Sequence, residues 1–151
     1  MKNKSLYLIL LISIVAFNSC SNNGAASTSQ QEEKKAEQNI KRYASITGLK
    51  PDMEAYYREL HAHVWPAVLN KISECNIRNY SIYEKQIEGK IYLFSYFEYV
   101  GNDFDNDMKK MAADTTTQRW WKETAPTQIP LPDAAAKNET WSTMEEVFHT
   151  N

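Results

Sequence analysis

The sequence is poor in the residues from which cofactor and metal sites are usually built. Its 151 residues include only four glycines, two cysteines and three histidines. The chain contains no glycine-rich phosphate loop, no CxxC pair and no Ser–His–Asp arrangement in a recognisable context. The sequence patterns of nucleotide-binding proteins, thiol–disulfide oxidoreductases and serine hydrolases are therefore excluded.

Positive charge is also scarce, since the formal net charge is -2 and the pI is about 5.9. A nucleic-acid-binding protein usually carries a basic stripe, and none is present, so no nucleic-acid partner is expected. Aromatic residues, in contrast, are plentiful, with nine tyrosines and four tryptophans. Large rings with polar tips favour sites that bind polar ligands.

The first 20 residues are typical of a signal peptide. Lys2 and Lys4 precede an apolar run from Leu6 to Phe17, which is too short to span a bilayer comfortably, and the segment ends in "FNSC". This resembles a bacterial lipoprotein signal, in which Cys20 is lipidated, and the alternative is an ordinary secretory signal with an incidental cysteine. We expect an exported lipoprotein of the bacterial cell envelope, which contacts the membrane only through its acyl chains.

Residues 21–40 follow as a polar segment that cannot bury a core, so they are predicted to be a flexible tether. Residues 41–151 then form the folded domain. If Cys20 is acylated, Cys75 has no partner for an intramolecular disulfide. We interpret Cys75 as a small apolar helix residue.

The domain has the element order β-α-β-β-α-β. A strand begins at residue 41, and a helix from residue 51 is interrupted at Pro66. Two strands flank "EGK" as a hairpin, and a helical stretch breaks near Asp114, where an aspartate can cap a new start. A proline-containing loop leads to a last strand, "STMEEVFHT". This order predicts an α+β, ferredoxin-like antiparallel sheet with helices on one face.

Aromatic residues occupy both faces of the strand that includes residues 91–98. One face carries Tyr92, Phe94 and Tyr96, and the other carries Phe97 among smaller residues. A solvent-facing side of an antiparallel sheet is normally polar. We therefore predict a homodimer in which a second copy covers this face.

Tyr57 and His61 are four residues apart, so their side chains stack on one face of the helix. His61 lies at the edge of the apolar stripe, where an imidazole can change its charge near neutral pH. A partly buried histidine, bonded to Tyr57 or to the backbone, is the alternative interpretation. His63 points about 200° away from His61, so the two rings do not converge on a metal.

Trp120 and Trp121 are adjacent on a predicted helix, and one narrow stripe cannot easily bury both rings. A sugar is a plausible cover for the spare ring, because its C–H faces pack on aromatic planes. The alternative is that both rings serve the core and the dimer interface. Tyr80, on the second strand, is either a site residue or another sheet aromatic.

Four segments together resemble the L-rhamnose mutarotase family: "YRELHAHVWPAVL", "IRNYSIY", "MAADTTTQRWW" and "MEEVFH". The resemblance covers roughly residues 41–150. It implies a dimeric α/β barrel that interconverts the α and β anomers of L-rhamnose without a cofactor. It also implies that His61 is the proton donor and that Tyr57, Tyr80, Trp120 and Trp121 contact the sugar. The export signal is a departure, since members of this family are expected in the cytoplasm.

The corresponding hypothesis is that protonated His61 donates to the ring oxygen of the sugar as the hemiacetal opens. The second proton carrier is a bound water or a carboxylate such as Asp114. A positioned acid or base contributes roughly 10²–10⁴-fold per proton transfer. The competing hypotheses are a non-catalytic sugar-binding or sensing lipoprotein and a small-substrate oxygenase on the same fold.

Overall fold

The computed structural model describes residues 40–150. The predicted signal peptide, Cys20 and all of the tether except its last residue lie outside the described residues. Within residues 40–150, no helix is long and apolar enough to cross a membrane.

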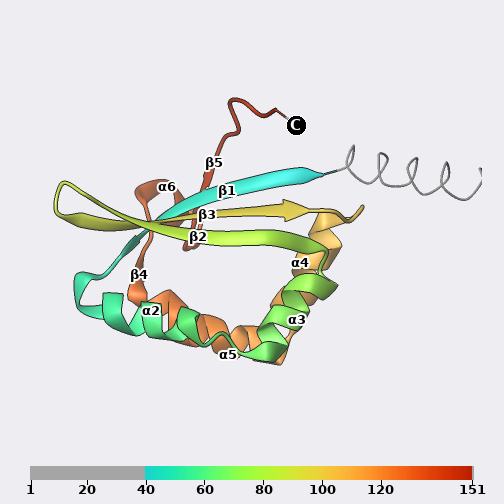
Figure 1. The fold of residues 1–151 in the computed structure, drawn as a ribbon, viewed down its shortest axis with the longest axis horizontal. Coiled ribbons are helices and arrows are strands. Elements are labelled where there is room, and N and C mark those ends of the chain that lie inside the picture. The colour runs from blue at the N-terminus through green and yellow to red at the C-terminus, as the bar shows by residue number, and fades with distance from the viewer. Residues whose placement is uncertain (1–39, 151) are drawn as a thin grey trace, which may run out of the picture.

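Three long antiparallel strands make up most of the sheet: β1 (Lys41–Leu49), β2 (Ile77–Ile87) and β3 (Lys90–Tyr99). The strand order is β2-β3-β1-β4 (Figure 1). The hairpin between β2 and β3 turns on Glu88 and Gly89, whose φ angles of 49° and 77° are both positive. A two-residue turn of this kind matches the twist of the flanking strands, and it confirms the hairpin predicted around "EGK".

The edge strand beside β1 is split into two short pieces. β4 (Gln128–Ile129) pairs with the end of β1, and β5 (Ser142–Met144) pairs with its middle. The chain leaves the sheet between them and forms the short helix α6 (Pro132–Ala135). The predicted last strand is therefore only three residues long. Beyond it, Glu146 bonds through its carboxylate to the Arg42 side chain of β1, at 2.6 Å, rather than through its backbone.

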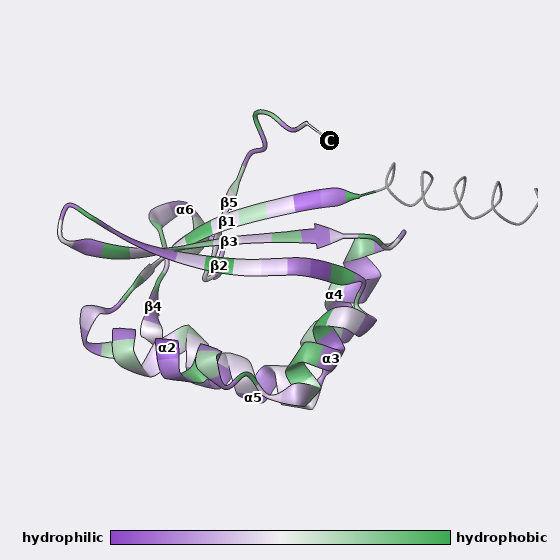
Figure 2. Ribbon diagram, viewed as in Figure 1, coloured by the Kyte–Doolittle hydropathy of each residue, from purple (hydrophilic) through white to green (hydrophobic). Residues whose placement is uncertain are grey.

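The larger helices lie on one face of the sheet, whereas α6 and the C-terminal end lie toward the other (Figure 1). They are α2 (Glu54–Ala62), α3 (Pro66–Glu74), α4 (Phe104–Ala113) and α5 (Thr115–Thr124); the three-residue 3-10 turns η1 (Pro51–Met53) and η2 (Ala125–Thr127) lie directly before α2 and directly after α5. In Figure 2, hydrophobic and hydrophilic residues interleave along α2 and α3, as expected of helices with one buried face. The ferredoxin-like α+β prediction is confirmed.

The predicted helix interruptions follow from local chemistry. Pro66 occupies the first turn of α3, where its missing N–H leaves no hydrogen bond unmade. Asp114 caps α5 by accepting a hydrogen bond from the Thr117 backbone N–H at 2.7 Å. A sharp change of direction therefore separates α4 from α5, and it places α5 beneath the sheet.

The core lies between the sheet and the helix layer, and it contains Leu49, Tyr57, Ile91 and Leu93. Residues of the other sheet face alternate with these core residues. On that face Tyr83 of β2 pairs with Phe94 of β3, and Tyr83 remains 64% exposed. The aromatic outer face predicted from the sequence is thus present.

Candidate active site

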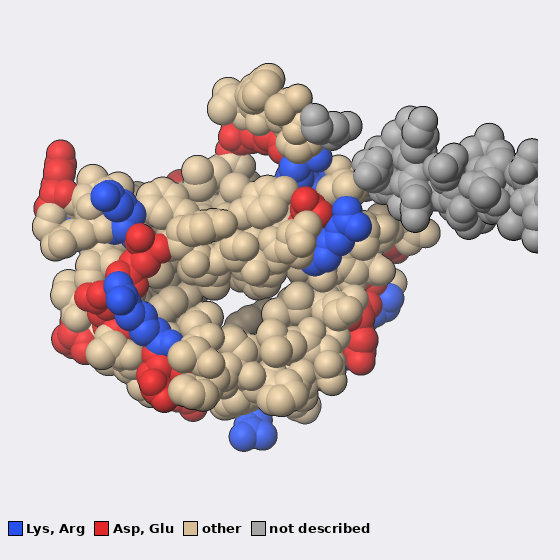
Figure 3. All heavy atoms as spheres, in the orientation of Figure 1, with Lys and Arg blue, Asp and Glu red and all other residues tan. Residues whose placement is uncertain are grey.

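The helix layer does not close fully against the sheet, and a cleft of about 800 Å³ lies between them. Figure 3 shows the opening between the strands above and the helices below. Its walls combine aliphatic side chains, polar groups that include Gln128 and Glu139, and the aromatic rings of Tyr80, Phe97, Phe104, Trp120, Trp121 and Trp141. A smaller cavity of about 360 Å³ adjoins α2, and Tyr57, His61 and Glu84 line it.

His61 and Tyr57 stack on the inner side of α2, with ring centroids 4.0 Å apart. The His61 Nδ1 atom lies 2.9 Å from the Tyr57 carbonyl oxygen. A carbonyl only accepts hydrogen bonds, so Nδ1 carries the proton and Nε2 keeps its lone pair in the neutral ring. The backbone bond of the alternative interpretation is present, and the ring also borders a cavity.

Burial lowers the pKa of His61, and the hydrogen bond to the Tyr57 carbonyl opposes this effect only in part. An isolated histidine has a pKa of about 6.5. His61 is therefore mainly neutral at pH 7, with an Nε2 atom that can accept a proton.

The Tyr57 hydroxyl is the unusual polar group of the site. The residue is 4% exposed, and its hydroxyl has no hydrogen-bond partner among the described residues. Burial raises the pKa of Tyr57, with a smaller contribution from Tyr80, and the nearby Gln128 side chain opposes the rise. A buried hydroxyl without a partner is costly, and a ligand group that bonds to it would remove this cost.

The two adjacent tryptophans have different environments. Trp120 is 7% exposed, and it packs edge-on against His61 and Trp65 with centroid distances of 5.3 and 5.4 Å. Trp121 is 42% exposed and lines the large cleft beside Trp120. One ring therefore belongs to the core, and the other is available to a ligand. Arg119 lies 5.3 Å above the Trp65 ring, in a cation–π contact.

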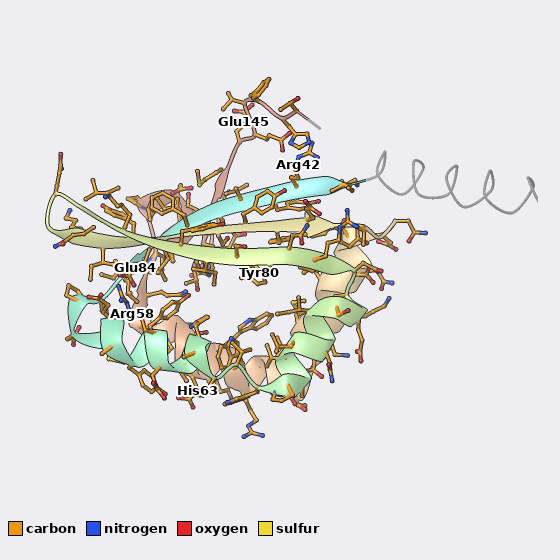
Figure 4. All side chains as sticks on the ribbon, viewed as in Figure 1. Arg42, Arg58, His63, Tyr80, Glu84 and Glu145 are labelled. Atoms are coloured by element: carbon orange, nitrogen blue, oxygen red, sulfur yellow. The ribbon has the colours of Figure 1, made fainter. Side chains whose placement is uncertain are left out.

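Tyr80 points from β2 into the space between the sheet and the helices (Figure 4). The pairing of β2 with β3 shifts between Arg78 and Ser81, and Asn79 has a φ of 51°. Such a bulge re-aims the side chains around it. The Tyr80 ring contacts Phe97 edge-on at 5.6 Å and lines the large cleft.

The structure thus gathers all five predicted residues on the helix side of the sheet, in two adjoining cavities. Tyr57 and His61 line the smaller one, whereas Tyr80, Trp120 and Trp121 line the larger one. The edge contact between His61 and Trp120 joins the two groups.

Two other sequence candidates lie away from this junction. His63 follows the end of α2 and is labelled on the outer side of the helix layer in Figure 4, within 3.1 Å of Glu59. Asp114 is committed to capping α5, and the hydrogen bonds from Thr117 lower its pKa. Among residues 40–150, no group of three His, Cys, Asp or Glu side chains could hold a metal ion.

Sequence reasoning missed two features of the site. Arg58 of α2 bonds to both carboxylate oxygens of Glu84 on β2, at 2.5 and 3.2 Å (Figure 4), and both residues line the same cavity as His61. The Arg58 hydrogen bond is the main cause of the lowered pKa of Glu84. Gln128 is the second feature, since it stands in a loop-like stretch whose register with β1 no local pattern reveals.

The family model for L-rhamnose mutarotase matches residues 42–150. The L-rhamnose mutarotase of Bacillus subtilis is 32% identical over 58% of this chain and 79% of its own length. The one from Oceanobacillus iheyensis is 29% identical over 73% of this chain and 98% of its own. The crystal structure of L-rhamnose mutarotase FA22100 from Formosa agariphila is similar in fold, with a TM-score of 0.55 and 23% identity over 74% of this chain and 99% of that one.

Proposed function

Because the chain belongs to the L-rhamnose mutarotase family, a family of carbohydrate isomerases, we propose that it interconverts the α and β anomers of L-rhamnose or a similar 6-deoxy sugar. The observation that carries the proposal is a neutral, half-buried His61 stacked on Tyr57, whose hydroxyl lacks a partner among the described residues. A titrating group and an unsatisfied donor lie together beside an aromatic cleft. Acid/base opening of a sugar ring needs such a group to transfer protons and such a donor to orient the sugar.

The lowered pKa of His61 supports a mechanism in which the donated proton comes from the substrate. In the resting protein Nε2 takes the proton of the C1 hydroxyl while the C1–O5 bond breaks and a C1=O1 double bond forms. The resulting imidazolium then donates its Nε2 proton to O5, which completes the open aldehyde. His61 is still the donor to the ring oxygen, but its proton comes from the substrate.

The aldehyde rotates about its C1–C2 bond and closes on the other face, which reverses the proton transfers. O1 then stands on the opposite side of C1, so a second carrier must return its proton. Asp114 is bonded to Thr117 and lies in the cap of α5. We assign this second step to a bound water rather than to Asp114.

The remaining predicted residues hold the sugar in this proposal. The exposed Trp121 ring covers the apolar C–H face of the sugar and its 6-methyl group, with Trp120 beside it. The hydroxyls of Tyr57 and Tyr80 orient sugar hydroxyls. Excluding water from this aromatic cleft strengthens each polar contact.

The test is NMR saturation transfer between the two anomeric protons of L-rhamnose. His61→Ala is expected to lower the enzymatic exchange rate by roughly 10²–10⁴-fold, the usual contribution of a general acid or base. His63→Ala is the matched control, because His63 lies two residues away on the outer side of the helix layer (Figure 4). Equal exchange by both variants contradicts the proposal. Sugar binding by the native protein without exchange above buffer identifies a non-catalytic binder instead.

We also propose that the protein is a homodimer joined through the outer face of the sheet. Tyr83 on this face is 64% exposed, and Val147 and Phe148 beyond β5 are 96% and 81% exposed. Analytical ultracentrifugation tests this proposal: Tyr83→Arg is expected to shift the mass toward the monomer. Leu69→Arg, at a 52% exposed position of α3 in the helix layer, is the control. A native monomer contradicts the proposal.

For the N-terminal segment we propose export and acylation of Cys20, as the "FNSC" sequence predicts. Mass spectrometry of the mature N-terminus tests this. The expected species begins at Cys20 with attached acyl chains, and Cys20→Ser is expected to abolish it. A mature N-terminus at another residue identifies an ordinary secretory signal.

A further inference from the structure

Gln128 is a buried polar residue at the junction of the two cavities. It pairs with Leu49 of β1, and paired residues of antiparallel strands share a face, so its side chain lies on the helix side of the sheet. It is 7% exposed and lines the large cleft together with Tyr80, Trp120 and Trp121. It also lies near the Tyr57 hydroxyl, whose pKa it lowers.

The neighbours of Gln128 use their polar atoms within the protein. The Thr127 hydroxyl donates to the Thr124 carbonyl at 2.6 Å, and the Thr124 hydroxyl donates to the Trp120 carbonyl at 3.2 Å. The Gln128 carboxamide has two N–H donors and an oxygen acceptor, and its approach to the Tyr57 hydroxyl can use only one of these groups. This leaves hydrogen-bonding capacity at the wall of the cleft, where an apolar residue would suit a purely structural role better.

We propose that Gln128 determines substrate specificity: its carboxamide and the Tyr57 hydroxyl together bind one ring hydroxyl of the sugar, at a carbon other than C1. This rests on the proposed function. A sugar hydroxyl donates to the Gln128 Oε1 atom and accepts from the Tyr57 O–H, so one group satisfies both protein residues. The pair therefore rejects a sugar that lacks this hydroxyl, because two buried polar groups are then left without partners.

The test is a double-mutant-type cycle, in which one change is made in the protein and the other in the sugar. Gln128→Leu removes the carboxamide at nearly constant volume, and the 2-, 3- and 4-deoxy analogues of L-rhamnose each remove one hydroxyl. Removing one partner of a buried hydrogen bond is expected to lower the exchange rate on L-rhamnose by about 10- to 100-fold. The native protein is expected to lose a similar factor on one of the three analogues. On that analogue Gln128→Leu is expected to lower the exchange rate no further. On the other two analogues it is expected to lower the exchange rate by the same factor as on L-rhamnose.

Two controls separate specificity from folding. Ile129→Ala changes the adjacent residue, which is 47% exposed, and is expected to leave the ratio of rates between sugars unchanged. Gln128→Met, a second nearly isosteric variant, replaces Gln128→Leu if the latter fails to fold, as judged from its thermal midpoint.

An equal loss on L-rhamnose and on all three analogues overturns the inference, and so does the absence of any loss. If the native protein exchanges no anomers, the proposed function fails, and the same cycle is then measured from sugar dissociation constants by NMR titration. A native protein that neither exchanges nor binds these sugars overturns both.

Discussion

Two buried tyrosines, Tyr99 and Tyr57, show how differently two ends of the same domain are built. The Tyr99 hydroxyl donates to Asp107 at 2.8 Å and accepts from the Asp103 N–H at 2.9 Å. The Tyr57 hydroxyl has no hydrogen-bond partner among the described residues. The hydrogen bonds of the first hydroxyl are complete within the protein and those of the second are not. We therefore expect the first to serve stability and, under the proposed function, the second to bind the sugar.

The polar groups around the Tyr99 hydroxyl have hydrogen-bond partners within the protein. Asp107 accepts further hydrogen bonds from the Asn76 amide at 2.7 Å and from the Lys110 ammonium at 2.8 Å. Packing is also tight, because a Cβ atom added at Gly101 would lie 2.3 Å from the Tyr99 hydroxyl oxygen. By contrast, the Tyr57 side adjoins cavities of about 360 and 800 Å³.

Exchanging each tyrosine for phenylalanine tests the comparison most strongly. Tyr57→Phe removes an unpaired hydroxyl, so the thermal midpoint is expected to change by no more than about 2 °C while the anomer exchange rate falls by about 10- to 100-fold. Tyr99→Phe removes one of the donors to Asp107 and leaves the Asp103 N–H without its acceptor, so the midpoint falls by about 5 °C at an unchanged exchange rate per folded molecule. The measurements are circular dichroism melting and saturation transfer. If Tyr57→Phe melts early and Tyr99→Phe loses exchange, the comparison is wrong.

Asp107→Ala extends the test to the centre of the network. The substitution removes the acceptor that Tyr99, Asn76 and Lys110 share. We expect the thermal midpoint to fall on the order of 10 °C, because the buried Tyr99 hydroxyl and the partly buried Asn76 amide lose their partner at once. Asp105→Ala, in the same first turn of α4, is the control. The exchange rate of the folded fraction is expected to remain at the native value, since the network lies outside both cavities.

The sequence predicts what local chemistry determines. Pro66 and Asp114 interrupt helices because of their own covalent and hydrogen-bonding properties, and the "EGK" turn defines the hairpin. The i and i+4 spacing of Tyr57 and His61 likewise predicts their stacking.

Contacts between residues that are distant along the chain cannot be predicted from a local sequence pattern. Asn76 and Asp107 are 31 residues apart, and Arg42 and Glu146 are 104 apart. The split of the edge strand into β4 and β5 depends on pairing with β1, and this pairing alone turns Gln128 toward the cleft. The missed residues of the site therefore depend on tertiary register rather than on a motif.

The change of stability with pH is a smaller effect that distinguishes the Tyr99–Asp107 network from the Tyr57 site. Hydrogen bonds from Lys110, Asn76 and Tyr99 lower the pKa of Asp107 from 3.8 to about 2. A carboxylate whose pKa is depressed on folding contributes stability above its unfolded pKa, and the contribution is lost as the pH falls through the folded value. In Asp107→Ala, the stability change between pH 4 and pH 2, measured by urea unfolding, is therefore expected to be shallower than in the native protein. Parallel curves contradict this expectation.

The pH dependence of catalysis is the smallest expected effect, and it tests the state of His61. Because burial lowers the His61 pKa below 6.5 and the neutral ring takes the first proton, kcat/KM is expected to be level near pH 7. It then declines by a few-fold as the pH falls through the lowered pKa. If the free protein instead had to start with a protonated ring, the rate would fall as the pH rises toward neutrality. Saturation transfer at several pH values, corrected for buffer exchange and repeated with His63→Ala, decides between the two directions.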